Sequence, residues 1–133
     1  MTLENRQVLV VDDEPISQML LEVFLKSLCY QPTFACEGRE ALKHFNKKLF
    51  SHVILDFNMP GMNGPATAQA IRNIEKDKNL QPTVIIGLTA NQEPTAHQAG
   101  LLAGMNAVYT KPIRIETLKE ALKLSCQQQQ SST

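Results

Sequence analysis

The stretch VLVVDDEP, residues 8–15, decides the fold and the place of the candidate site. An apolar run rich in β-branched residues is followed at once by Asp12 and Asp13, and Pro15 suits the first turn of a helix. A continuous apolar run is typical of a strand that is buried on both faces of a parallel sheet. The stretch therefore predicts a central strand that ends in two carboxylates and continues into a helix.

Three other stretches share this form: VILDFNMPGMNG (53–64), GLTAN (87–91) and YTKPI (109–113). Their apolar runs end at Asp56, Thr89 and Lys111. With a weaker strand near 33–36, the strands are expected at 8–11, 33–36, 53–55, 83–88 and 107–109.

Helices are expected between these strands. The first shows helical spacing of Ile16, Leu20, Val23 and Phe24, and the next begins at Gly38. The third ends before the polar break EKDKNLQP, the fourth covers 94–103 with alanines 96, 99 and 103 as its face, and the last begins near 115. Strands and helices that alternate predict an α/β fold with a doubly wound, five-stranded parallel sheet and five helices. Right-handed crossovers favour the flavodoxin-like strand order 2-1-3-4-5.

The bulk composition describes an ordinary globular chain. It has 133 residues, of which 43% are hydrophobic, and thirteen basic residues balance thirteen acidic ones. We expect one domain over 1–126 and a polar tail, QQQQSST, over 127–133. A zero net charge offers no case for direct nucleic-acid or membrane binding, and no apolar run reaches the roughly 20 residues of a membrane span. Three widely spaced cysteines and no signal peptide favour reduced thiols and a cytoplasmic location.

The carboxyl ends of parallel strands meet at one edge of the sheet, so Asp12, Asp13 and Asp56 should lie together. Clustered carboxylates repel each other, and a divalent cation removes that penalty. Mg²⁺ prefers oxygen ligands and keeps several waters. We expect Asp13 and Asp56 as direct ligands, the Asn58 carbonyl as a third, and Asp12 acting through water.

The same edge would carry phosphoryl chemistry. Asp56 is the candidate nucleophile, which would form an acyl phosphate, and the metal would neutralise charge on the transferring group. Lys111 would pair with the phosphoryl oxygens and Thr89 would donate a hydroxyl hydrogen bond. Taken singly, an Asp pair after a strand is more often a helix cap, and a lone lysine is more often a solvated surface group. Only their joint placement points to a site.

With these motifs the chain resembles the response-regulator receiver domain (CheY-like) of two-component signalling, over roughly residues 6 to 126. The resemblance implies that Asp56 is the phosphoacceptor, Asp12 and Asp13 the acidic pair, Thr89 the switch hydroxyl and Lys111 the lysine of the site. It also implies a phosphoryl group supplied by a histidine kinase or a histidine phosphotransfer protein, and a phosphorylation-controlled interaction surface. The stretch LTANQEP…GMNAVYTKPI is similar to receivers of hybrid sensor kinases.

One position departs from the family pattern. Receivers usually carry an aromatic switch residue three positions before the lysine, and here that residue is Val108. Tyr109 is one step later, and neighbouring strand residues point to opposite faces, so it is not an obvious substitute. The usual coupling between the Thr89 hydroxyl and an aromatic ring is therefore in question.

Three other functions remain as alternatives. An aspartate-nucleophile phosphohydrolase typically has a second acid two residues after its nucleophile, where this chain has Asn58. A flavin-binding electron carrier would need phosphate donors in the first loop, where DDE would repel a phosphate. A phosphate sink without output cannot be separated from a signalling receiver on sequence.

Overall fold

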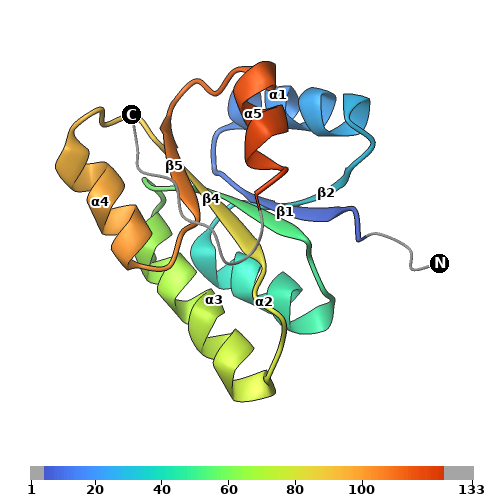
Figure 1. The fold of residues 1–133 in the computed structure, drawn as a ribbon, viewed down its shortest axis with the longest axis vertical. Coiled ribbons are helices and arrows are strands. Elements are labelled where there is room, and N and C mark those ends of the chain that lie inside the picture. The colour runs from blue at the N-terminus through green and yellow to red at the C-terminus, as the bar shows by residue number, and fades with distance from the viewer. Residues whose placement is uncertain (1–4, 125–133) are drawn as a thin grey trace.

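The computed structural model describes residues 5–124 (Figure 1). Strands and helices alternate along this part of the chain, as expected. In order they are β1 Gln7–Val11, α1 Pro15–Ser27, β2 Gln31–Ala35, α2 Gly38–Lys47, β3 His52–Asp56, α3 Gly64–Lys78, β4 Val84–Thr89, α4 Pro94–Leu102, β5 Ala107–Thr110 and α5 Ile115–Ala121.

The five strands form one parallel sheet in the order β2-β1-β3-β4-β5, which confirms the predicted topology. The register pairs Val11 with Leu55, so that Asp12 and Asp56 follow directly after paired residues on adjacent strands. On the other side, Asp56 pairs with Leu88 and Thr89 pairs with Thr110. The sheet therefore brings all the predicted strand ends to the same edge.

Helices cover both faces of the sheet, with α1 and α5 on one face and α2, α3 and α4 on the other (Figure 1). Each face has its own apolar core. Alternate residues of a strand point to opposite faces, so Leu9 and Val11 pack under α2 and α3 while Val8 and Val10 pack under α1 and α5. The central strands β3 and β4 are buried along their whole length, as parallel strands between two helical layers must be.

Helix α1 exists where it was predicted, but it packs through other residues. Its buried side chains are Leu21 and Leu25. The residues whose spacing predicted the helix include Ile16 and Val23, which are 80% and 64% exposed. Both stripes have helical spacing, so the repeat alone predicts the helix and not its orientation.

Helix α4 was expected to present alanines 96, 99 and 103, and that expectation is only partly right, because Ala103 packs against the core but Ala99 is exposed. Its buried residues are His97 and Gly100. A Cβ at Gly100 would lie 2.7 Å from atoms of both Phe57 and Val108. The glycine that weakens the helix in sequence terms is thus the residue that lets α4 approach the sheet closely.

The predicted tail 127–133 lies outside the described residues, and the domain bounds 1–126 stay a prediction. Within residues 5–124, none of the helices has the length and apolar character needed to span a bilayer.

Candidate phosphoryl-transfer site

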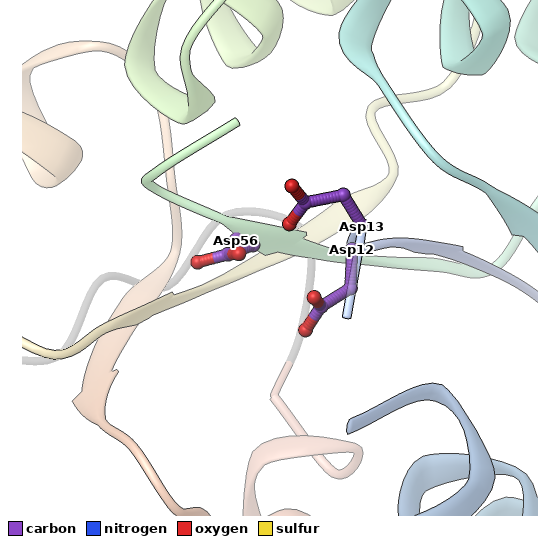
Figure 2. A group of neighbouring side chains, drawn as sticks. All are labelled: Asp12, Asp13 and Asp56. Carbon is purple, nitrogen blue, oxygen red and sulfur yellow. The ribbon is translucent and has the colours of Figure 1, made fainter. Parts of the chain in front are cut away.

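Three carboxylates meet at the carboxyl edge of the sheet (Figure 2). Asp12 and Asp13 follow β1, and Asp56 is the last residue of β3. One oxygen from each of the three side chains lies within 4.8 Å of the others. Asp12 and Asp56 are buried, whereas Asp13 is exposed. The expected acidic cluster is therefore present, and its open side faces solvent at Asp13.

Local hydrogen bonds hold the two loops that carry these acids. The Asp12 side chain accepts a bond of 2.9 Å from the Glu14 backbone N–H, and its own N–H donates to the Ala35 carbonyl at 3.0 Å. The Asn58 N–H donates to Asp56 Oδ1 at 3.3 Å. Asn58 itself is exposed beside the acids. That the Asn58 carbonyl binds the metal stays a prediction.

The donor set fits a hard divalent cation. All three side chains offer carboxylate oxygens, which is the ligand type that Mg²⁺ prefers. Asp12 Oδ2 is buried and has no hydrogen bond of regular geometry among the described residues, although the Lys111 ammonium lies 3.2 Å from it. A carboxylate oxygen can accept more than one bond, so Asp12 can still accept one from an ordered water.

Lys111, which follows β5, brings positive charge to the acids. Its Nζ lies 3.2 Å from Asp12 Oδ2 and 3.4 Å from Asp56 Oδ2. The backbone N–H of Lys111 donates to the Thr89 carbonyl at 2.8 Å, which fixes the strand end. The peptide bond between Lys111 and Pro112 is cis.

Burial and charge act against each other in this pocket. Burial raises the pKa of Asp56, Lys111 opposes that rise, and the neighbouring Asp12 charge adds to it, so that the pKa lies above its ordinary value. Burial lowers the pKa of Lys111, but its contacts with Glu14, Asp56 and Asp12 outweigh burial and raise the pKa overall. Lys111 is therefore a permanent cation, while Asp56 carries its charge at a cost.

Thr89 ends β4, the strand next to Asp56, and its side chain is buried. Its hydroxyl oxygen accepts a hydrogen bond of 3.0 Å from the Asn91 N–H, which shapes the loop into α4. The hydroxyl hydrogen is left for another acceptor, because a hydroxyl can accept and donate at once. The predicted hydroxyl is thus present on the strand beside Asp56.

Val108 and Tyr109 point to opposite faces of β5. Val108 belongs to the core under α2, α3 and α4, while Tyr109 packs with the core under α1 and α5. Tyr109 therefore does not take the place of the usual aromatic residue. His97 Nε2 of α4 contacts Thr110 Oγ1 of β5 at 3.3 Å.

Glu14 also belongs to the site, although its sequence context did not single it out. Glu14 Oε1 lies 2.9 Å from Lys111 Nζ, the shortest of the three carboxylate contacts that the described residues make with this ammonium. The sequence signal was the third acid of the DDE cluster, which had been given no role. The contact joins residues 97 positions apart, so spacing along the chain could not have revealed it.

Comparison of the sequence with known proteins shows which family this chain belongs to. The family model described as "Response regulator receiver domain" matches residues 8–123. The chain is similar to the sensor histidine kinase RcsC of Escherichia coli, at 36% identity over 121 residues, which cover 91% of this chain and 12% of RcsC. It therefore spans about an eighth of the length of such curated relatives.

Solved structures agree with that match. The receiver domain of the sensor histidine kinase PA1611 from Pseudomonas aeruginosa, solved with magnesium in its active-site cleft, has a TM-score of 0.80 at 28% identity and covers 90% of this chain and 96% of that one. The receiver domain of Ssk1 from Saccharomyces cerevisiae, solved with the phosphotransfer protein Ypd1, is also similar, with a TM-score of 0.83 at 26% identity. The match covers 92% of this chain and 89% of that one. The chain belongs to the response regulator receiver domain family of two-component signalling.

Proposed function

We propose that this receiver domain accepts a phosphoryl group on Asp56. The observation that carries the proposal is the buried Asp56 carboxylate with Asp12 and Asp13 oxygens within 4.8 Å and the Lys111 ammonium at 3.4 Å. Asp56 is a nucleophile at the end of a buried strand. The Lys111 ammonium lies beside it, where the phosphoryl oxygens would be bound. Few other reactions need this combination.

The bond changes are simple. An Asp56 carboxylate oxygen attacks phosphorus, the bond from phosphorus to the donor atom breaks, and that electron pair leaves with the donor group. Lys111 and the Thr89 hydroxyl then bond to the phosphoryl oxygens that Asp56 carries. Asp13, Asp56 and the Asn58 carbonyl would hold Mg²⁺, with Asp12 acting through water, and the ion would neutralise negative charge on the transferring group.

The donor we propose is a phosphohistidine of a histidine kinase or of a histidine phosphotransfer protein. Support comes from the kinds of proteins that match: a sensor histidine kinase by sequence, and a receiver bound to a phosphotransfer protein by structure. The domain would then act in a phosphorelay, either alone or as one part of a longer hybrid kinase. A cytoplasmic location belongs to this proposal, and the described cysteines, Cys29 and Cys36, are both free thiols.

We further propose that the output is a changed protein-interaction surface and not turnover of an external substrate. The second acid of a phosphohydrolase is absent, because Asn58 stands at that position. The new charge on Asp56 would draw in Thr89, which ends β4 before α4, and Lys111, which follows β5 before α5. The face formed by α4, β5 and α5 would shift between two states. In this chain Val108 stands at the position where receivers usually carry the aromatic switch residue.

The test is phosphotransfer from a purified, phosphorylated histidine phosphotransfer protein, with Mg²⁺ or with EDTA. We expect the label to pass to the wild-type chain only with Mg²⁺, and not to an Asp56→Asn variant. Acetyl phosphate, which needs no docking surface, serves as a second donor. If each donor labelled the Asp56→Asn variant as strongly as the wild type, Asp56 would be refuted as the acceptor.

A further inference from the structure

Glu14 forms an ion pair with Lys111, the cation that we propose binds the phosphoryl group. Its Oε1 is 2.9 Å from Lys111 Nζ, closer than Asp12 Oδ2 at 3.2 Å and Asp56 Oδ2 at 3.4 Å. Asp12 and Asp56 are buried parts of the pocket, whereas the Glu14 side chain is 64% exposed. Glu14 therefore contacts Lys111 from the solvent side, and solvent can hydrate its carboxylate when this contact breaks.

We propose that Glu14 competes with the incoming phosphoryl group for Lys111 and so slows phosphorylation of Asp56. The inference rests on the proposed function of Asp56 as phosphoacceptor. An ammonium has three N–H donors, and in the unphosphorylated protein three carboxylates surround it. The phosphoryl oxygens must share the Lys111 ammonium with these carboxylates, and Glu14, which accepts a hydrogen bond from Lys111 and is exposed to solvent, is the one that they can displace.

Within residues 5–124, the only partner of the Glu14 carboxylate is Lys111, so the local structure does not otherwise depend on it. Glu14 precedes α1, but its side chain makes no hydrogen bond that caps this helix. Its backbone N–H bonds to Asp12 Oδ1 and its carbonyl accepts from the Gln18 N–H, and both bonds survive a change of side chain. A Glu14→Gln variant should therefore fold normally and lose only the charge that holds Lys111.

A different role of Glu14, as a support for Mg²⁺ binding, predicts the opposite effect on the rate. If Glu14 instead supported the metal through a bound water, its charge would strengthen Mg²⁺ binding, and Glu14→Gln would weaken Mg²⁺ binding and slow the reaction. The two roles thus predict rate changes of opposite sign. A titration with Mg²⁺ alone separates them without any phosphoryl transfer.

The experiment compares initial rates of labelling by acetyl phosphate in the wild type, Glu14→Gln and Glu22→Gln. Glu22 is the matched control, because it is another exposed glutamate that is 2.9 Å from a lysine, Lys26, but on α1. We expect Glu14→Gln to react roughly two- to fivefold faster at low salt, the scale of one solvent-exposed ion pair, with less gain at high salt. The control should react like the wild type.

A general loss of negative charge near an anionic donor would also speed labelling, and a double-mutant cycle isolates the role of Lys111. In a Lys111→Ala background, Glu14→Gln should bring no acceleration. Acceleration that persists there, a slower Glu14→Gln, or an unchanged rate would each overturn the inference. If the wild type labels on Asp56 and the variant does not react faster, only this inference fails; a wild type that never labels refutes the phosphoacceptor assignment and this inference with it.

Discussion

Replacing Asp56 with asparagine should stabilise the metal-free fold near neutral pH. Asp56 is buried, and oxygens of two other carboxylates lie within 4.8 Å of one of its own. With an effective dielectric constant of about 20, the attraction of Lys111 at 3.4 Å amounts to roughly 5 kcal/mol, and the repulsion by the buried Asp12, taken at 4.8 Å, to roughly 3.5 kcal/mol. Solvent screens the charge of the exposed Asp13, so it adds less. Burial of the Asp56 charge is the largest contribution and, with Asp12, outweighs the attraction of Lys111, so we expect Asp56→Asn to raise the free energy of unfolding by about 2 kcal/mol.

The pH dependence of this effect has a definite sign. The folded-state pKa of Asp56 is raised above its ordinary 3.8, so the native state binds the proton more tightly than the unfolded chain. The penalty of the charge is complete above the folded pKa and disappears as the pH falls through that pKa towards 3.8. The advantage of the variant should therefore be greatest near neutral pH and vanish in acid.

Magnesium should reverse the order of stability. The ion binds the native wild type and removes the repulsion, and at a hundredfold excess over its Kd it contributes about 2.7 kcal/mol. The variant lacks one proposed ligand and gains less.

The assay is thermal and urea unfolding of both proteins in EDTA and in Mg²⁺, where about 2 kcal/mol corresponds to a shift in Tm of roughly 6 °C. Asp77→Asn, at an exposed position of α3, is the control. A variant that is less stable than the wild type in EDTA at pH 7 would refute the reasoning, because the Asp56–Lys111 ion pair would then dominate.

Two further predictions concern the switch and the packing. Lys111→Ala should still bind Mg²⁺, since Lys111 is not a proposed ligand, but should lose the phosphorylation-dependent changes in NMR chemical shift over α4 and β5. Loss of Mg²⁺ binding in this variant, or full shift changes, would contradict that role. Gly100→Ala should lower the free energy of unfolding by about 1–3 kcal/mol, because its Cβ would lie 2.7 Å from Phe57 and Val108, and urea unfolding beside the exposed Gln98→Ala would measure the loss. Equal stability of the two variants would mean that α4 moves away at little cost.

The fold and the acidic cluster could be predicted because both depend on strand ends. An apolar run that stops at Asp12, Asp56 or Thr89 indicates where a buried strand reaches the edge of the sheet, and parallel pairing then brings these ends together. No helix orientation was needed for that argument. The register of the central strands confirms it.

The orientation of helices could not be predicted in the same way. Helix α1 has apolar residues on two sides, and spacing cannot tell the buried Leu21 from the exposed Val23. In α4 the buried residues are a histidine and a glycine, and neither has the apolar side chain by which a buried face is recognised. The contact of Glu14 with Lys111 depends on how the first and last loops meet at the edge of the sheet, which composition and periodicity do not report.

The central claim is that Asp56 itself carries the phosphoryl group, and chemical mapping tests this most directly. After labelling with acetyl phosphate and Mg²⁺, borohydride reduction converts a phosphorylated aspartate to homoserine, which peptide mass spectrometry locates. We expect homoserine at position 56 alone, dependent on Mg²⁺ and absent from unlabelled protein. Reduction at Asp12 or Asp13 in place of Asp56, or no homoserine in protein that has gained the phosphoryl mass, would contradict the account.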